Sequence, residues 1–255
     1  MFSWRNPQHT PFVVAHRGSS AIAPENTLAA FQQAIDDGAD AIELDVRLSK
    51  DGEVVVIHDE KLSRTTDGRG RVSDYTLKEL KQFSAGKWFH RRFSRETIPT
   101  LAEVFALLQG KVGVNIEMKE GHFSSRRHNI VDRCIDTIRG AGASVAVLIS
   151  SFHYPYVKRS RNIEPSIATG VLYHPVHQLA RSPLRIIRSS DADFFIVNKS
   201  FFRKYIVQFA HHHHILAGVY TVNTLKETAR ALLFGADVIF TDDPAKIFQF
   251  FTLLK

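Results

Sequence analysis

A strand, a helix and a second strand can be read in residues 12–46, FVVAHRGSSAIAPENTLAAFQQAIDDGADAIELDV. The apolar, β-branched runs at 12–16 and 41–46 have the length and composition of buried strands. Between them, Asn26 can cap a helix and Gly38 can end it. The apolar residues of that helix follow helical spacing: Leu28, Phe31 and Ile35. The stretch therefore predicts a β-α-β unit with parallel strands.

The same alternation of short apolar runs and helical patterns continues along the chain. Eight candidate strands occupy residues 12–16, 41–46, 113–118, 145–150, 167–173, 194–198, 215–222 and 238–241. Gly38-Ala39-Asp40 is repeated as Gly235-Ala236-Asp237, with a looser copy at Asp191-Ala192-Asp193, and this echo favours a repeated architecture. We predict an α/β fold, a TIM (β/α)8 barrel rather than a doubly wound sheet.

Length and strand spacing bear on domain organisation. The chain has 255 residues, 44% of them apolar, which is the size of one large α/β barrel or of two small domains. We predict a single barrel domain over residues 1–255. The second and third strands lie so far apart in sequence that a small insertion is expected at about 51–112. Within it, residues 52–58 read as a short strand, and residues 76–83 and 101–108 read as helices.

The net charge of the chain and the distribution of its basic residues indicate which classes of binding partner to expect. The net charge of +7 and the pI near 9.6 favour anionic partners. The basic residues are scattered rather than arranged in a stripe with stacking aromatics, so no nucleic acid is expected. The Phe-rich segment 247–254 is read as a closing helix of the barrel, with contact to an anionic membrane surface or a second subunit as alternatives. The four histidines at 211–214 are read as a solvated loop.

Other features concern the cellular compartment. The lone Cys134 excludes an intrachain disulfide. No apolar run approaches the ~20 residues needed to span a bilayer, and the first ten residues lack the apolar core of a signal peptide. These features predict a soluble, cytoplasmic protein.

Three acids interrupt otherwise apolar strands. Glu43 and Asp45 are two residues apart on the second predicted strand, so their side chains share one face, and Glu117 lies in the third strand. A buried carboxylate is costly unless it is paired or bound to a metal. Three converging carboxylates would suit Mg²⁺ or Ca²⁺. The alternative is buried salt bridges to the nearby cations Arg17, Arg47 and Lys119.

Two histidines lie where apolar strands meet polar loops. His16 ends the first strand, and His58 ends the strand of the insertion. Taken singly, each is more often a structural histidine than a catalytic one. Together, at strand ends beside acids, they suggest an acid/base pair. Arg17 and Lys119 could then bind phosphate and balance the negative charge of the carboxylates.

These residues, in order and spacing, resemble the glycerophosphodiester phosphodiesterase family, of the phospholipase C-like phosphodiesterase TIM-barrel superfamily. The resemblance spans residues 12–248. It rests on the following motifs: His16-Arg17-Gly18, Pro24-Glu25-Asn26-Thr27, Glu43-Leu44-Asp45-Val46, His58-Asp59, Arg64-Thr65-Thr66-Asp67-Gly68-Arg69-Gly70, Asn115-Ile116-Glu117-Met118-Lys119, Ser151-Phe152, Thr221-Val222-Asn223 and Thr241-Asp242-Asp243-Pro244.

The resemblance implies metal-dependent hydrolysis of small-molecule glycerophosphodiesters to sn-glycerol 3-phosphate and an alcohol. It assigns the metal ligands as Glu43, Asp45 and Glu117, the acid/base pair as His16 and His58, the phosphate contacts as Arg17 and Lys119, and the substrate pocket as Phe152 and Tyr220. Many family members carry Trp where this chain has Tyr220. Two alternatives stay open, a barrel lyase or phospholipase D-like enzyme acting on intact lipids and a non-catalytic phosphate-ligand binder.

Overall fold

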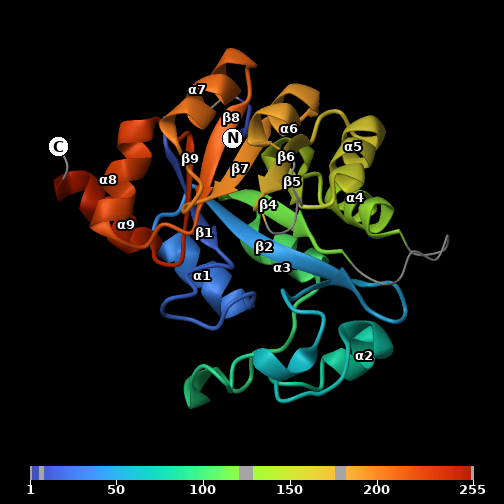
Figure 1. Ribbon diagram of the computed structural model, residues 1–255. Coiled ribbons are helices and arrows are strands. Elements are labelled where there is room, and N and C mark those ends of the chain that lie inside the picture. The colour runs from blue at the N-terminus through green and yellow to red at the C-terminus, as the bar shows by residue number, and fades with distance from the viewer. Residues whose placement is uncertain (1, 6–8, 121–128, 176–181, 254–255) are drawn as a thin grey trace.

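Eight parallel strands hydrogen-bond in a closed ring, and helices surround that ring (Figure 1). The computed structural model describes residues 2–5, 9–120, 129–175 and 182–253. The ring runs through β1, β2, β4, β5, β6, β7, β8 and β9 and returns to β1. Its strands are Phe12–His16 (β1), Ala41–Leu48 (β2), Gly113–Met118 (β4), Val147–Ser151 (β5), Ala168–Tyr173 (β6), Phe194–Asn198 (β7), Leu216–Tyr220 (β8) and Val238–Thr241 (β9). The predicted TIM barrel is confirmed, with every predicted strand present and no strand end shifted by more than two residues.

Helices follow the strands of the ring and lie on its outside. They are Leu28–Asp36 (α1), Leu101–Leu108 (α3), Ile130–Gly140 (α4), Tyr154–Ile163 (α5), Pro183–Ser189 (α6), Lys204–His212 (α7), Leu225–Phe234 (α8) and Pro244–Leu253 (α9). Several are capped by a side chain that accepts a backbone N–H: Thr27, Thr100, Asn129 and Thr224. Thr27 therefore takes the capping role predicted for Asn26, whose side chain is used elsewhere.

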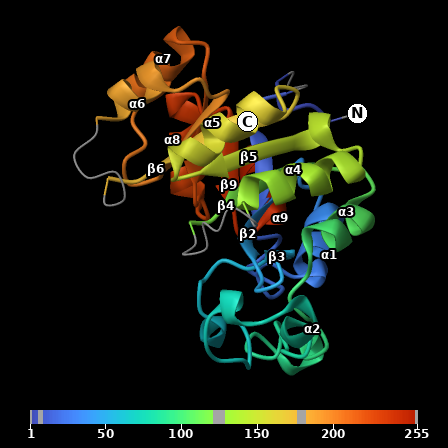
Figure 2. The same cartoon turned by 90° about the vertical axis from the view of Figure 1, so that its right-hand side faces the viewer.

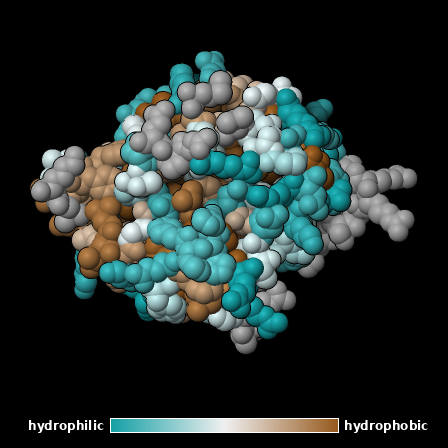
Figure 3. Space-filling model, turned by 90° about the horizontal axis from the view of Figure 1, so that it is seen from above, coloured by the Kyte–Doolittle hydropathy of each residue, from teal (hydrophilic) through white to brown (hydrophobic). Residues whose placement is uncertain are grey.

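The C-terminal helix α9 packs against β1 and α8, as expected for a closing helix of the barrel. Leu254, the last residue of the Phe-rich segment, lies outside the described residues. Apolar side chains are exposed on the flank of α8 and α9, at the left of the view from above (Figure 3), and they include Leu225, Leu233 and Leu253. Within the described part of the chain, every helix is too short or too polar to cross a bilayer.

The histidines at 211–214 lie at the end of α7 rather than in a free loop. His211 and His212 belong to the helix, and His213 follows it as its C-cap. The His211 ring nitrogen Nε2 lies 2.6 Å from Asp237 Oδ2. The His213 ring nitrogen Nδ1 lies 2.9 Å from the Phe209 carbonyl oxygen. The histidines are largely exposed, as predicted for a solvated segment, but His211 and His212 belong to the helix and only His213 and His214 lie in the turn that follows it.

An aromatic plug fills the barrel interior at the amino ends of the strands. Trp4 is completely buried, and its indole N–H donates to the Ala146 carbonyl at 3.0 Å. Its ring makes edge contacts with Phe12 and Phe194, at centroid distances of 5.9 and 5.6 Å. Above the plug the interior is filled by strand residues such as Ile196 and Phe240. The barrel interior is therefore a packed core, and Ile196 and Phe240 also line a pocket above it.

Residues 49–99, referred to here as the insertion, leave the ring after β2 and project from one side of it (Figures 1 and 2). The insertion contains β3 (Val54–Val56), η1 (Leu62–Arg64), η2 (Val72–Asp74), α2 (Leu77–Leu80) and η3 (Arg91–Phe93). It packs around its own small core of Val55, Ile57, Leu62, Val72, Leu80, Ala85 and Ile98. β3 pairs antiparallel with β2, and α3 packs between α1 and α4 in the helix ring. The helix predicted at 76–83 is only a single turn, α2.

The repeated Asp residues have one structural role. Each Asp follows a helix, and its carboxylate accepts the backbone N–H of a residue in the strand before that helix. Asp40 accepts from Val13 at 2.8 Å, Asp193 from Thr169 at 2.8 Å and Asp237 from Ala217 at 2.7 Å. The echo in the sequence therefore marks equivalent positions at the amino ends of neighbouring strands. Its role is to join adjacent β-α units at that face of the barrel.

Candidate active site

Three carboxylates meet at the carboxyl ends of two neighbouring strands. Asp45 on β2 lies opposite Glu117 on β4 in the strand register, and Glu43 lies two residues before Asp45. One oxygen from each lies within 4.8 Å of the others. Glu43 and Asp45 are only 3% and 1% exposed. The acids predicted to share a face thus converge on one point.

Two cations lie against these acids. Lys119 Nζ is 2.9 Å from Asp45 Oδ1 and also forms an ion pair with Glu117. Arg17 Nε is 3.3 Å from Asp45 Oδ2, and the Arg17 backbone N–H donates to Glu43 Oε2 at 2.9 Å. The Arg17 backbone has a left-handed φ of 59°, a conformation that is unusual for arginine and is typical of strained functional sites.

The cations compensate the acids unequally. Burial, followed by the charge of Asp45, raises the pKa of Glu43 to about 8. Burial also opposes ionisation of Asp45, but Lys119 and Arg17 hold the pKa of Asp45 well below its usual range. Arg47, the third cation considered from sequence, instead donates to the carbonyl oxygens of His58 and Glu120. The protein alone therefore leaves Glu43 without sufficient positive charge.

The donor set fits a hard divalent cation. Glu43 Oε1 is buried without a hydrogen-bond partner in the described structure, whereas Asp45 Oδ1 is paired with Lys119 Nζ at 2.9 Å. A buried carboxylate oxygen without a partner is costly. Mg²⁺ and Ca²⁺ prefer such oxygen ligands. Glu43, Asp45 and Glu117 are therefore the residues that would hold the metal.

His16 is held by an aspartate from the other end of the chain. Its Nδ1 lies 2.8 Å from Asp242 Oδ1, in the segment that follows β9. Asp242 also accepts from the Asn223 amide at 2.6 Å and from the Ser20 hydroxyl at 3.2 Å. Burial would lower the pKa of His16, but the hydrogen bond to Asp242 and the charge of Glu43 raise it overall. Because Nδ1 contacts Asp242, Nε2 is the ring nitrogen of His16 that remains for other partners. The His16 side chain lines the pocket.

His58 reaches the site through the insertion. Ile57 donates its backbone N–H to the Asp45 carbonyl at 2.9 Å, which places the following residue, His58, beside β2. The His58 Nδ1 lies 2.6 Å from Asp59 Oδ1. Burial lowers the pKa of His58, although Asp45 and Asp59 act in the opposite direction. Both predicted histidines thus have Nδ1 against a carboxylate.

Arg64 joins the insertion to the barrel beside this pair. Its guanidinium donates to Asp59, with Nε 2.6 Å from Oδ2, and to both carboxylate oxygens of Glu25 at 2.8 Å. Glu25 in turn accepts from Arg17 Nη1 at 2.8 Å. His58 and Arg17 are therefore connected through one continuous chain of charged hydrogen bonds.

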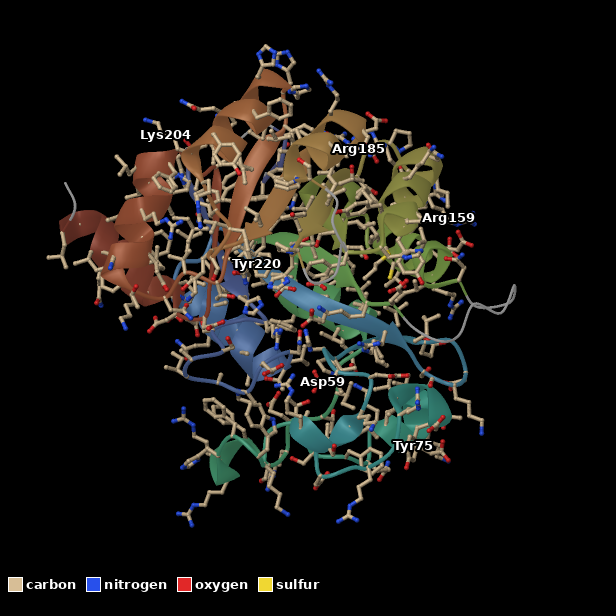
Figure 4. The ribbon with its side chains drawn as sticks, in the orientation of Figure 1. Asp59, Tyr75, Arg159, Arg185, Lys204 and Tyr220 are labelled. Carbon is tan, nitrogen blue, oxygen red and sulfur yellow. The ribbon has the colours of Figure 1, made fainter. Side chains whose placement is uncertain are left out.

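A single pocket collects the predicted residues. Eight of the nine line it: His16, Arg17, Glu43, His58, Glu117, Lys119, Phe152 and Tyr220. The ninth, Asp45, is buried and pairs with Lys119 at the pocket wall. The Phe152 and Tyr220 rings meet edge to face, with centroids 6.5 Å apart. Figure 4 shows Tyr220 near the centre of the barrel and Asp59 on the side of the insertion.

Several residues of the site were missed from sequence. Asn115 and His174 line the pocket, and Asp242 holds His16. Asn115 carried a usable signal, because it lies two residues before Glu117 on a strand and so shares its face. Thr241-Asp242-Asp243-Pro244 has the composition of a turn, and Asp243 does act as a cap by accepting the Lys246 N–H at 3.1 Å. His174 follows the sixth predicted strand and belongs to none of the motifs that carry the resemblance.

Comparisons with known proteins agree with this geometry. The model of the glycerophosphoryl diester phosphodiesterase family matches residues 16–246. A glycerophosphodiester phosphodiesterase of Caldanaerobacter subterraneus subsp. tengcongensis is 38% identical over 238 residues, covering 91% of this chain and 94% of that protein. A solved Oleispira antarctica phosphodiesterase, described in complex with the product sn-glycerol-3-phosphate, has a TM-score of 0.86 at 32% identity and covers 95% of this chain and 97% of its own.

A second solved structure, the glycerophosphodiester phosphodiesterase of Agrobacterium tumefaciens, has a TM-score of 0.79 at 29% identity and covers 92% of this chain and 98% of its own. The matches extend over nearly the whole chain and include both the barrel and the insertion. This chain belongs to the glycerophosphoryl diester phosphodiesterase family.

Proposed function

We propose that the protein hydrolyses glycerophosphodiesters to sn-glycerol 3-phosphate and an alcohol in the pocket between His16 and His58. The observation that carries this proposal is the meeting of two carboxylate-held histidines and three clustered acids in one cavity. The relative from Oleispira antarctica is described with sn-glycerol-3-phosphate as its product, which supports the substrate class. Mg²⁺ or Ca²⁺ is the proposed cofactor, held by Glu43, Asp45 and Glu117.

The cations of the chain would position the phosphodiester. A divalent metal bound to the three acids would supply Lewis-acid polarisation of the phosphoryl oxygens. Arg17 and Lys119 line the same pocket and carry the positive charge that an anionic diester needs there. Arg17 Nε faces Asp45 Oδ2 at 3.3 Å and Nη1 donates to Glu25 at 2.8 Å, so the guanidinium is fixed by two carboxylates beside the pocket.

The two histidines would move the protons. One removes a proton from the attacking oxygen as the new phosphorus–oxygen bond forms. The other donates a proton to the alkoxide that leaves as the old phosphorus–oxygen bond breaks. The attacking group is either water or the adjacent glycerol hydroxyl, and in the latter route a cyclic phosphate forms and water then opens it. Asp242 and Asp59 hold the two rings at Nδ1.

The direct test is an assay of released sn-glycerol 3-phosphate. Purified protein is incubated with glycerophosphocholine or glycerophosphoethanolamine, in the presence of Mg²⁺, Ca²⁺ or a chelator. We expect release with at least one metal and none with the chelator. Vesicles of intact phospholipid form a parallel arm, and cleavage there without cleavage of the soluble diesters would assign the site to lipids instead.

Metal binding has a readout that does not depend on activity. A ligand that binds only the folded state raises the unfolding temperature. We expect Mg²⁺ or Ca²⁺ to raise the Tm of the chelator-treated protein, because Glu43 has an oxygen without a partner in the described structure. Glu43→Gln should abolish that rise. An unchanged Tm with either metal in the unaltered protein would count against the metal site.

A further inference from the structure

A compact loop at the tip of the insertion has a surface that the reaction does not use. We call residues 84–95 together with Ile22 the basic-aromatic tip. The ends of the loop are joined by an antiparallel bridge between Ser84 and Thr97 and by the Ala85 N–H, which donates to the Glu96 carbonyl at 2.8 Å. η3 lies within the loop, and Gly86 packs so tightly that a Cβ there would meet the Phe93 carbonyl oxygen at 2.2 Å. The loop is therefore a formed structure.

The tip concentrates positive charge. Lys87, Arg91, Arg92 and Arg95 are all exposed, and the twelve residues 84–95 contain no acid. The loop therefore carries four positive charges in a chain whose net charge is +7. These cations form no ion pair with another described residue. The first acid after the loop, Glu96, is turned toward the barrel, where it accepts the Ala29 N–H at 3.2 Å.

Apolar surface lies among these charges. Trp88 is 43% exposed, and Ile22 from the loop after β1 is 42% exposed. Arg92 Nη2 donates to the Ile22 carbonyl at 3.2 Å, which places the two segments side by side. The Trp88 indole N–H donates to the Ala85 carbonyl at 2.9 Å, so the exposed part of the side chain has no polar group left to satisfy. Phe89 stacks edge-on behind Trp88, at a centroid distance of 5.6 Å.

We propose that the basic-aromatic tip binds the surface of an anionic lipid bilayer. Tryptophan favours the interface between lipid and water, and exposed Lys and Arg are attracted to anionic head groups. A nucleic acid fits less well, because single-stranded sites combine a groove with several exposed stacking rings. The tip instead projects from the molecule, at the lower left of Figure 1, and Trp88 is its one exposed large apolar ring.

Docking there would bring the catalytic face near the lipid surface. Ile22 belongs to the loop that follows β1 and carries Arg17, one of the residues lining the reaction pocket. This binding is separate from the chemistry, because no residue of the tip contributes to the proposed metal site or acid/base pair. Its test therefore does not depend on whether the proposed hydrolysis is correct.

Tryptophan fluorescence provides the first test. The chain has two tryptophans, and Trp4 is completely buried, so a change in the emission on binding reports Trp88. We expect a blue shift with vesicles of phosphatidylcholine mixed with phosphatidylglycerol, and none with phosphatidylcholine alone. Added salt should reverse the shift because it screens exposed charges. Absence of a shift with the anionic vesicles would overturn the proposal.

Charge reversal provides the second test, by sedimentation of the same vesicles with the full chain. R91E/R92E should weaken vesicle binding by about tenfold or more, given the attraction of each basic residue to anionic lipid. The matched control R185E/R188E alters two exposed arginines of α6, on the side away from the insertion (Figure 4), and makes the same change in net charge. We expect it to bind nearly normally.

Other results of these binding experiments would also decide whether the basic-aromatic tip binds anionic lipid. Equal loss of binding in both double variants would show that net charge alone is responsible, and would overturn the assignment to the tip. Binding to single-stranded RNA without binding to anionic vesicles would assign the tip to nucleic acid instead. Both double variants should show the same cooperative thermal unfolding as the unaltered protein, which would show that they are folded.

Discussion

His16 and Asp242 are 226 positions apart in the chain, and their side chains meet at 2.8 Å. The closure of the barrel explains this contact, because β9 pairs with β1 and Asp242 directly follows β9. Local sequence could not predict the pairing, since Thr241-Asp242-Asp243-Pro244 also has the composition of a turn. Asp242 is best described as a positioning residue, which acts through the orientation and basicity of His16.

Replacement of Asp242 tests that role. D242N should lower kcat for glycerophosphocholine by about a hundredfold, as expected when an acid/base group is disturbed, and leave KM nearly unchanged. Asp242 raises the pKa of His16, so its loss should lower that pKa and move the limb of the pH profile that belongs to His16 toward lower pH. The control is D243N, which changes the adjacent helix cap. A parallel rise in KM or an unmoved pH profile would favour a merely structural role.

The candidate metal ligands could be predicted because their signal is local. Glu43 and Asp45 share a strand face by their spacing, and Glu117 lies in register with Asp45 on the adjacent strand. What spacing could not show is how the positive charge is distributed. Lys119 and Arg17 both approach Asp45, while Glu43 keeps an oxygen without a partner in the described structure.

At the scale of elements, the insertion contributes a residue to the site, because His58 lines the pocket. β3 pairs with the end of β2 and brings His58 beside the acids. Arg64 then joins Asp59 of the insertion to Glu25 of the barrel. The short strand β3, which precedes His58, could be predicted from its apolar run. The bridge through Arg64 could not, because it depends on how the insertion packs against the loop after β1.

Replacement of Arg64 should therefore disturb both ends of the bridge. R64A should lower kcat/KM by about tenfold or more, with effects on both kcat and KM, because the partners of His58 and Arg17 lose their common donor. The kcat/KM of R64K should lie between those of R64A and the unaltered protein, since lysine keeps the charge but loses the bidentate geometry. The control is R71A, another arginine of the insertion, which pairs with Glu60. If R71A and R64A were equally impaired, a specific bridge would be excluded.

At the scale of the whole molecule, the alternation of apolar runs and helical patterns was sufficient to predict the barrel. Element ends were less predictable, because they depend on packing: residues Ser144–Ala146 form the turn η4 where a strand was expected to begin. The sequence also did not show that α3 belongs to the ring of helices. This helix is far along the chain from β2, yet it packs between α1 and α4.

The carboxylate of Asp193 should stabilise the barrel in a pH-dependent way. Burial opposes its ionisation, but hydrogen bonds from Arg5 and Thr169 and the charge of Arg161 lower its pKa. Such a group stabilises the fold above the pKa of the unfolded carboxyl, and the contribution is lost as the pH falls through the folded pKa. D193N should lower the free energy of unfolding by about 2 kcal/mol at neutral pH.

That deficit should shrink in acid, below about pH 4, where the unfolded carboxyl is protonated. Urea unfolding of the two proteins at several pH values measures it. D191N is the matched control, because the Asp191 side chain is 91% exposed although it lies 3.3 Å from Arg161. A deficit that stayed constant down to acid pH would show that the substitution acts through something other than the charge.

The most direct test of the account is the turnover of glycerophosphocholine by H16A, H58A and the double variant, with Mg²⁺ or Ca²⁺ present. We predict that each single substitution lowers kcat by about 10² or more while thermal unfolding stays cooperative. Residues that act as a unit are not additive, so the double variant should be about as inactive as the worse single variant. Near-normal turnover in either single variant would contradict the paired acid/base mechanism.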